Sequence, residues 1–455
     1  PLRDVAVFAH IADTQEQVHR FVPAGRLTRA AGGAGEPDAV SFSYGLRYLD
    51  RPGAFEVDPR ALSLRDRQSV RGTAMFPLAG LTEFGGIRDA APDAWGRRVI
   101  EARLNVPANS LDEFTYLLEA GGDRVGALDV RETIESPPIN AAGGLTSLPY
   151  LLQAAAAVEA GEPIPANLMP YLGGAPSAGG ARPKASVRDD NQVLWLAKFP
   201  ARRDAFDMAV AEGATLELAR RAGMTVPSVQ LHRVMDQSLL LIRRFDRYWA
   251  EPGQRLLAGT SAAGTDPQHG FTEGRLPQIS GLTLMGCDEM ASNSKSYVDL
   301  ANAIRQYCHP PSIAQDCAEL FARMVFNIFV TNDDDHLRNH AFNYDAGAGG
   351  WRLSPLYDVV PRPSVAYERM LHLGIGAKGR LADLENAMSQ HAAFIPNRPD
   401  AIAVVRRIWG EVRQWQGCFE ENGATPALLA TLGPAFRRLE DIASPELARE
   451  IRRGA

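Results

Sequence analysis

The chain has few cysteines and no long apolar run. Its 455 residues include four cysteines, which form no C-x-x-C pair: Cys287, Cys308, Cys317 and Cys418. This spacing argues against a disulfide framework or a zinc site and predicts reduced thiols, mostly in the core. No apolar run reaches the length of a membrane-spanning helix, and the start PLRDVAVFAH carries no signal-peptide pattern. We therefore expect a cytoplasmic protein with no membrane contact.

Positive charge is not in excess either. The 48 lysines and arginines are outnumbered by 54 acidic residues, which gives a net charge of −6. This balance argues against bulk electrostatic binding to nucleic acid, although it allows a local basic patch. A hydrophobic content of 45% with 22% charged residues is typical of a globular protein. The length exceeds that of one ordinary core, so we expect two or three domains.

The most informative stretch is 326–358, FNIFVTNDDDHLRNHAFNYDAGAGGWRLSPLYD. An apolar helical pattern over 318–330 ends in a short acidic loop. Two strand-like runs follow, at 340–344 and 350–353, joined by a glycine-rich turn. The stretch therefore predicts a helix, an acidic loop and a hairpin in that order.

The acidic loop has the residue spacing of a kinase catalytic loop. Asp334 and Asn339 stand in the D-x-x-x-x-N arrangement, and Asp358 follows the hairpin, where a kinase has its metal-binding Asp. Phosphoryl transfer needs a carboxylate for the hydroxyl proton, with an amide and a second carboxylate for Mg²⁺. A solvated acidic turn would explain DDD alone, but not the whole set. We predict Asp334 as catalytic residue and Asn339 and Asp358 as Mg²⁺ ligands.

A glycine-rich segment precedes a strand that contains a lysine. The segment 172–187 has the composition of a loop whose backbone N–H groups hold phosphates, but it lacks the GxxxxGK[ST] pattern. Lys198 lies in the apolar run 193–200, where a lysine is costly unless it meets a charge such as an ATP phosphate. Loop, strand lysine, helix and catalytic loop follow the kinase order, so Lys198 joins the predicted catalytic and ATP-binding residues. The predicted ATP-binding loop residues are Ala178, Gly179, Gly180, Ala181, Arg182 and Pro183.

His336 lies between Asp334 and Asn339 and is counted with the predicted ATP-binding residues. It could act as a proton shuttle, but a structural role in fixing the loop is the preferred interpretation.

Several segments resemble one known family. NDDDHLRNH followed by LSPLYDVVP closely resembles the HipA-type serine/threonine kinases, which are bacterial toxins of toxin–antitoxin pairs. SAGGARPKA and LAKFP resemble that family's phosphate loop and lysine strand, and LLLIRRFDR resembles its hinge. APDAWGRRVI resembles the LPDxWGR motif that ends the family's amino-terminal subdomain, and we assign it a structural role. In place of the HQED-like motif of many members, the chain has RLPQISGLTLMGCDEM.

The resemblance implies further site residues and partners. Glu212 in the helix 204–222 matches the family's motif better than Glu217 does and would pair with Lys198, although an ordinary surface glutamate is the alternative. Arg244 and Phe245 would belong to the hinge, whose backbone binds adenine. ATP and Mg²⁺ are the implied cofactors. The implied partners are a protein substrate, with an aminoacyl-tRNA synthetase as one acceptor, and a small helix-turn-helix antitoxin that carries the contact with operator DNA.

The expected fold is α+β, a two-lobed kinase-like fold with a small β-rich amino-terminal domain. The expected segments are 1–140 for that domain, 141–245 for the kinase N-lobe and 246–455 for the helical C-lobe. We expect a surface loop over 248–276 and mainly helices after residue 296. The expected helices are 297–307, 313–330, 382–393, 398–417, 426–438 and 444–453.

The expected function is an ATP- and Mg²⁺-dependent serine/threonine-protein kinase that acts as a toxin. Two alternatives stay open. The chain could be a catalytically weak kinase-fold module that binds a DNA-binding antitoxin, or it could phosphorylate a small molecule or a lipid. ATP turnover separates the first alternative from a kinase, whereas the residues do not encode the acceptor.

Ser177 generates the first testable prediction, because it matches the serine that HipA-type kinases phosphorylate on themselves. A phosphate there adds nearly two negative charges to a loop whose amides should hold ATP phosphates. Mass spectrometry after incubation with Mg²⁺ and ATP should find phosphate on Ser177, and that species should bind ATP poorly. Ser177→Ala should keep its ATP affinity and should not inactivate itself. A phosphorylated form with unchanged ATP affinity would contradict this mechanism.

Overall fold

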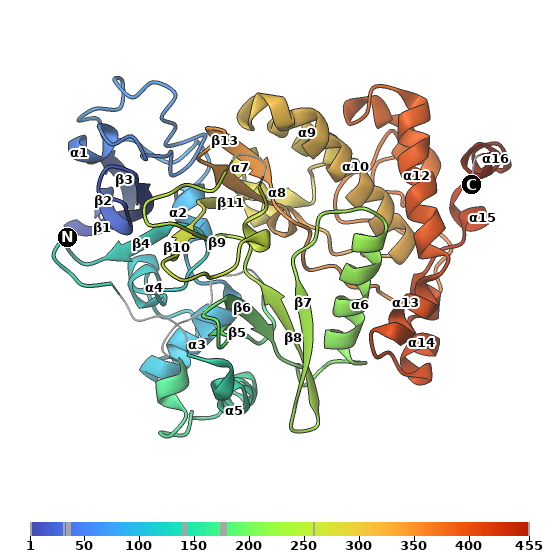
Figure 1. Ribbon diagram of the computed structural model, residues 1–455, viewed down its shortest axis with the longest axis horizontal. Helices are drawn as coiled ribbons and strands as arrows, with labels where there is room; N and C mark the ends of the chain where they lie inside the picture. The colour runs from blue at the N-terminus through green and yellow to red at the C-terminus, as the bar shows by residue number, and fades with distance from the viewer. Residues whose placement is uncertain are drawn as a thin grey trace. The chain divides into compact units, whose positions relative to one another are not determined.

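The computed structural model describes residues 2–30, 32, 38–138, 143–172, 180–257 and 260–453. The chain forms two compact units, and its course changes from one unit to the other several times. Figure 1 labels the helices and strands. Unit 1 comprises Pro1–Arg202, Leu241–Gly286 and Phe342–Trp351, and unit 2 comprises Arg203–Leu240, Cys287–Ala341 and Arg352–Ala455. Since neither unit is continuous in sequence, the division into three consecutive segments stays a prediction. The mixture of helices and small sheets confirms the expected α+β class.

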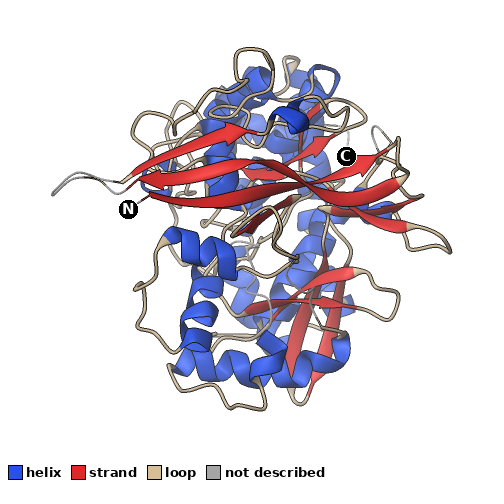
Figure 2. Ribbon diagram, turned by 90° about the vertical axis from the view of Figure 1, so that its left-hand side faces the viewer, coloured by secondary structure: helices blue, strands red, loops and turns tan. Residues whose placement is uncertain are grey.

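An antiparallel sheet forms the first part of unit 1 and appears as long red strands beside the mark N in Figure 2. Its strands are β1 (Leu2–Asp13), β2 (Val18–Ala30), β3 (Ala39–Tyr44) and β4 (Leu128–Arg131), in the order β3-β2-β1-β4. Alternate residues of β1, among them Val5 and Val7, point into one core together with Phe42 of β3. The expected β-rich amino-terminal domain is thereby confirmed.

Short helices and hairpins make up the rest of unit 1. Its helices are α1 (Leu46–Leu49), α2 (Gly85–Asp89), α3 (Ala94–Leu104), α4 (Glu113–Glu119), α5 (Leu148–Ala160) and α7 (Gly281–Met285), with 3-10 turns η1 (Leu145–Ser147), η2 (Met169–Leu172) and η3 (Ala262–Gly264). Two antiparallel pairs are β5 (Lys184–Arg188) with β6 (Leu194–Lys198), and β9 (Arg247–Ala250) with β10 (Thr272–Arg275). β5 and β6 belong to a four-stranded sheet of order β5-β6-β8-β7, in which β7 (Val229–Val234) is part of unit 2 and β8 (Gln237–Arg243) begins in unit 2 and ends in unit 1. A further sheet has the order β11-β12-β13 and consists of β11 (Gln278–Ser280), β12 (Ala341–Asp345) and β13 (Gly350–Leu353).

The expectation of a surface loop over 248–276 is wrong. This segment begins and ends in the β9–β10 pair, and it buries a small apolar cluster that includes Tyr248 and Leu256. Gly274 lies against the Tyr248 ring so closely that a Cβ there would be 2.1 Å from a ring carbon. The segment has few apolar residues, and its strands pair across a long connection, so local periodicity does not indicate them.

Unit 2 is built around one buried helix. α9 (Tyr297–Tyr307) and α10 (Ile313–Val330) have the bounds expected from the sequence. α10 contacts α9, α11 (Leu384–Ser389) and α12 (Arg398–Val412), and every residue from 320 to 330 is buried. A helix that is apolar all round belongs in a core. The other elements are α6 (Met208–Arg221), α8 (Glu289–Ser292), α13 (Trp415–Glu421), α14 (Pro426–Leu432), α15 (Leu439–Ile442), α16 (Pro445–Arg452), η4 (Pro310–Ser312), η5 (Leu337–Asn339), η6 (His391–Ala393) and η7 (Gly433–Ala435).

Two expected helices near the carboxyl end are shorter than predicted. The range 398–417 splits into α12 and α13, and the range 426–438 ends as α14 at Leu432. Pro434 explains the second break, because proline removes a helix hydrogen bond and clashes with the preceding turn. All four cysteines are buried, and none of them forms a disulfide bond within the described residues. Among the described residues, no helix combines the length and apolar character that crossing a membrane requires.

A buried ionic network ties distant segments of unit 1 together. Asp246, only 1% exposed, accepts hydrogen bonds from Arg244 and Arg247 at 2.6 Å and from the Gly126 backbone N–H at 2.7 Å. Burial opposes the charge of Asp246, yet the two arginines hold the pKa of its carboxyl below the usual range. Burial also lowers the pKa of Arg247, to about 10. Asp246 is therefore the counter-ion on which this part of the fold depends.

Replacing Asp246 with alanine would leave two guanidinium groups buried without their carboxylate. We expect the free energy of unfolding, measured by chemical denaturation, to fall by about 3–5 kcal/mol. The exposed pair of Arg449 and Glu446 offers a control, since Glu446→Ala should change that free energy by no more than about 0.5 kcal/mol. Similar losses in both variants would contradict the role given to Asp246.

Candidate active site

The acidic loop begins where α10 ends in unit 2. Thr331 ends the helix with a left-handed backbone, φ 53°, which is unusual for a β-branched residue. Its hydroxyl donates to the Ala435 carbonyl and accepts from Arg369. Asn332 donates to Asn327 twice, from its backbone and from its side-chain amide, each time over 3.1 Å. The chain therefore enters the loop in one fixed direction.

Asp335 is the buried anchor of the loop. Its carboxylate, 1% exposed as a residue, accepts from the Tyr297 hydroxyl and from Asn327 Nδ2 at 2.8 Å, and it lies 3.1 Å from His340 Nε2. Burial alone would raise the pKa of Asp335, but His340 and the Tyr297 hydroxyl outweigh burial and lower it. Burial and the charge of Asp335 together raise the pKa of Tyr297, which stays a donor. The Asp335 carboxylate thus joins α9, α10 and His340, the residue before β12, through these contacts.

Sequence reasoning did not single out Asp335, although one signal was present. Asp335 and His340 have the same five-residue separation as Asp334 and Asn339, shifted by one position. In the structure Asp335 and His340 are both buried, whereas Asp334 is exposed. The remaining partners, Tyr297 and Asn327, come from helices and have no local signature.

Asp334 has an exposed side chain that forms an ion pair with Arg362. Its side chain is 54% exposed, and Arg362 Nη2 lies 2.6 Å from its carboxylate, while Arg362 Nε lies 3.2 Å from the neighbouring Asp333. The predicted base is therefore accessible, but its charge is shared with Arg362. Exposure and a nearby guanidinium suit a carboxylate that must meet an incoming hydroxyl, provided that Arg362 can yield.

Asn339 is held onto the same loop. It is 5% exposed, belongs to η5, and donates from Nδ2 to the Asp334 main-chain carbonyl over 3.1 Å. The bond uses the nitrogen end of the amide, so Oδ1 is the end that can ligate a metal. The structure thus brings two predicted residues, Asp334 and Asn339, together.

Asp358 has a strained backbone. Its φ is +59°, in the left-handed region that non-glycine residues seldom adopt and that clusters at functional sites. The preceding Tyr357 donates from its hydroxyl to the Arg338 carbonyl over 2.6 Å, which ties this segment to the acidic loop. Asn339 and Asp358 offer only oxygen ligands, as Mg²⁺ prefers when phosphates and water complete its shell. No cluster of three His, Cys, Asp or Glu side chains able to hold a metal exists among the described residues.

His336 does not settle into an obvious structural role. Its Nδ1 is buried and has no hydrogen-bond partner among the described residues, and its ring packs edge-on against His372. The expectation that hydrogen bonding of the ring fixes the loop is not met at this nitrogen. The His336 backbone does hold the turn: its N–H donates to the Asp334 carbonyl over 2.8 Å, and its carbonyl accepts from the Asn339 backbone N–H over 2.9 Å.

Unit 1 carries the predicted phosphate loop and lysine. Gly180, Ala181, Arg182 and Pro183 are described, whereas Ser177, Ala178 and Gly179 lie outside the described residues. Lys198 is the last residue of β6, and the Phe199 backbone N–H donates to the Pro183 carbonyl over 3.0 Å. The end of the loop is therefore joined to the strand that presents Lys198.

The predicted hinge residues Arg244 and Phe245 form hydrogen bonds with other parts of unit 1. The Arg244 side chain belongs to the buried ionic network, and its backbone N–H donates to Leu194 over 3.0 Å. The Phe245 carbonyl accepts from Asn343 Nδ2 over 3.2 Å. Arg244 thus has a structural role in its side chain, and contact with adenine stays a prediction for both residues.

The two candidate glutamates of α6 differ in burial. Glu212 is 5% exposed, whereas Glu217 forms ion pairs with Arg220 and Arg221 on the helix surface. Glu217 is therefore an ordinary helical salt-bridge residue. Glu212 and Lys198 belong to different units, so their pairing stays a prediction.

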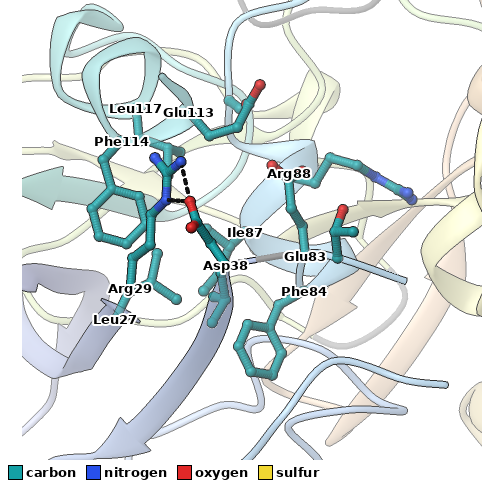
Figure 3. Close-up of a pocket in the computed structure, with 13 residues that line it drawn as sticks. Leu27, Arg29, Asp38, Glu83, Phe84, Ile87, Arg88, Glu113, Phe114 and Leu117 are labelled. Carbon is teal, nitrogen blue, oxygen red and sulfur yellow. Dashed lines mark hydrogen bonds and ion pairs between the residues drawn. The ribbon is translucent and has the colours of Figure 1, made fainter. Parts of the chain in front are cut away.

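A separate pocket of about 210 Å³ lies in unit 1 (Figure 3). Its floor is apolar and includes Phe84, Ile87 and Phe114, while Arg29 and Asp38 pair at its edge over 2.6 Å. None of the predicted site residues lines it. The pocket is thus unrelated to the predicted chemistry.

The burial of Asp335 predicts a pH-dependent loss of stability in Asp335→Asn. A carboxyl with a lowered pKa in the folded chain stabilises it above the unfolded pKa of about 3.9, and that contribution fades as the pH falls through the folded pKa. At pH 7 we expect the variant to be less stable by about 1.5–3 kcal/mol. The difference should shrink below about pH 4.

Asp333→Asn is the matched control, because Asp333 is half-exposed and adjacent. Thermal unfolding of Asp333→Asn across the same pH range should follow the wild type within about 1 kcal/mol. A pH-independent loss in Asp335→Asn would contradict a charged Asp335.

Comparison with known proteins agrees with this arrangement. The family described as HipA-like C-terminal domain matches residues 176–416, more than half of the chain. The curated protein "Putative kinase Y4mE" of Sinorhizobium fredii (strain NBRC 101917 / NGR234) is 26% identical over 377 residues, which cover 76% of this chain and 78% of that protein. A chain from the Shewanella oneidensis MR-1 toxin–antitoxin complex of HipA, HipB and operator DNA aligns with a TM-score of 0.60 and 15% identity over 95% of both chains. This last match shows the fold. The family model covers more than half of the chain, and the chain therefore belongs to the HipA-like family.

Proposed function

We propose that this HipA-like protein is an ATP-dependent serine/threonine-protein kinase. The observation that carries the proposal is the acidic loop of unit 2. There the Asn339 amide is bonded to the Asp334 main chain, and the buried Asp335 anchors the turn between them. A D-x-x-x-x-N loop held in this way presents one carboxylate outward and one amide beside it, as phosphoryl transfer requires.

Asp334 would orient the acceptor hydroxyl and take its proton as the hydroxyl oxygen bonds to the γ-phosphorus of ATP. The bond from that phosphorus to the β–γ bridging oxygen would break in the same step, and ADP would leave. Its 54% exposure leaves room for an incoming hydroxyl, and Arg362 would have to release the carboxylate. Lys198 and the backbone of the loop 178–183 would hold the phosphates by charge and by N–H donors. His336, with an unpartnered Nδ1, could contact the nucleotide or relay the proton.

The ligand chemistry supports a magnesium requirement. Asn339 Oδ1 and the Asp358 carboxylate would hold Mg²⁺, which supplies charge neutralisation on the phosphates when it is bound. The left-handed backbone of Asp358, φ +59°, is the kind of strain that a fold keeps only where a side chain must point in one direction.

We further propose that the acceptor is a protein and that the chain acts as the toxin of a toxin–antitoxin pair. The structural neighbour from Shewanella oneidensis MR-1 is a toxin–antitoxin protein solved with HipB and operator DNA, which supports a small DNA-binding antitoxin as partner. With a net charge of −6, this chain itself would contact operator DNA mainly through that partner. The catalytic residues do not distinguish among protein acceptors, including an aminoacyl-tRNA synthetase.

Transfer of radiolabelled γ-phosphate from ATP into a lysate of the source cell tests the proposal. Asp334→Asn should lower the transfer rate by roughly 10²–10⁴-fold, the usual contribution of a general base, and should keep ATP binding measurable. Asp358→Ala should weaken Mg²⁺-dependent ATP binding as well. Asp333→Asn, which alters the adjacent carboxylate on the same Arg362, is the matched control and should retain most of the activity. Wild-type rates in Asp334→Asn, or no label in any protein, would contradict the proposal.

A further inference from the structure

The APDAWGRR motif contacts the phosphate loop within unit 1. This motif opens α3, and its first turn makes three contacts with the segment 180–184. Trp95 donates from its backbone to the Gly180 carbonyl over 3.4 Å and from Nε1 to the Lys184 carbonyl over 2.9 Å. Asp93 Oδ2 lies 2.9 Å from Lys184 Nζ. One helix turn thus holds both ends of this segment.

The ion pair between Asp93 and Lys184 is buried. The two side chains are 4% and 2% exposed. An ammonium in such a place is costly unless a carboxylate meets it, and losing one partner strands the other. The second carboxylate oxygen of Asp93 accepts from the Gly96 backbone N–H over 2.7 Å, which caps α3. Asp93 therefore joins the start of the helix and the end of the loop through one side chain.

Gly180 fits this contact because it has no side chain. Its φ is +102°, a conformation that favours glycine, and a Cβ there would lie 3.0 Å from Lys184 Nζ. A side chain at residue 180 would strain the backbone and press on the ammonium. The glycine therefore allows the backbone at residue 180 to lie close to the Lys184 ammonium.

Lys184 also stands directly opposite Lys198 in the β5–β6 pair. Opposite residues of an antiparallel pair share one face, and like charges there repel each other. The carboxylate of Asp93 lies against the Lys184 ammonium and offsets the repulsion that this ammonium would exert on Lys198 across the pair. A change in the charge of Asp93 would therefore affect Lys198, the predicted phosphate-binding residue, through its cross-strand neighbour Lys184.

We propose that Asp93 is a positioning residue for nucleotide binding. With Trp95 it holds the exit of the phosphate loop and the first residue of β5, so that the amino-terminal motif controls affinity for the nucleotide's phosphates. This inference rests on the proposed kinase function and extends it to a motif that the sequence alone marks as structural. A purely structural role would leave the discrimination between ATP and adenosine unchanged.

The test compares Asp93→Asn with the wild-type chain by calorimetric titration of ATP with Mg²⁺ and of adenosine. Asparagine keeps an oxygen for the Gly96 N–H but removes the charge that Lys184 needs. We expect ATP to bind roughly ten- to a hundredfold more weakly, the usual size of coupling between linked sites, and adenosine to bind equally well. Hydrogen exchange of the peptide 180–188, measured without nucleotide, should become faster.

The matched control is Glu113→Gln. Glu113 of α4 pairs over 2.6 Å with Arg97 of α3, the helix that Asp93 caps. Among the described residues, Glu113 has no hydrogen bond or ion pair to the segment 180–184. This variant should leave both the ATP affinity and the exchange of 180–188 at wild-type values. If Asp93→Asn does not fold, Trp95→Phe replaces it in the test. This variant keeps an aromatic ring and removes the bond to the Lys184 carbonyl together with part of a buried side chain; it should weaken ATP binding and leave adenosine binding unchanged.

The outcomes separate this inference from the proposed function. Failure of the wild-type chain to bind ATP would remove the proposed function. Normal ATP binding by Asp93→Asn, with or without faster exchange of 180–188, would overturn the positioning role. An equal loss of affinity for ATP and adenosine would also overturn it, because that pattern indicates general damage to the fold.

Discussion

A buried carboxylate that cannot stay unpaired organises the acidic loop of unit 2. Asp335 sits in the core of unit 2, where an ion is tolerated only with a full set of partners, and it takes them from α9, α10 and His340. Because those partners are rigid, the loop around Asp335 has little freedom. Its neighbours Asp334 and Asn339 therefore have defined directions before any substrate arrives, which is what catalysis by positioning requires.

Unit 1 repeats the same principle with different residues. Asp246 gathers Arg244 and Arg247, and Asp93 gathers Lys184, each in a place with almost no exposure. Such pairs stabilise a fold little more than apolar side chains in the same place would. They do fix the positions of both partners, because displacing one partner leaves the other as an unpaired buried charge. The predicted hinge residue Arg244 and the end of the predicted phosphate loop are attached to these pairs. A fold with many irregular segments thus gains defined positions where nucleotide chemistry would need them.

The long apolar segments of the fold could be read from the sequence. α9 and α10 have the predicted bounds, and the hairpin of β12 and β13 lies where the glycine turn predicts it, because helical periodicity and turn residues are local signals. The β9–β10 pair could not be read, since its strands are short and polar and meet only across a long connection. Pro434, by contrast, was a visible stop signal that should have shortened the predicted helix.

The sequence by itself determined the chemical inventory of the candidate site: the D-x-x-x-x-N spacing, Asp358, Lys198 and the glycine loop, all of which are local patterns. The tertiary structure decided which of three adjacent acids is buried, because the partners of Asp335 come from residues 297 and 327. It also decided that the APDAWGRR helix meets the phosphate loop, since Asp93 and Lys184 are 91 positions apart. Spacing along a chain can identify chemistry, whereas the burial of a charge depends on partners that only the fold supplies.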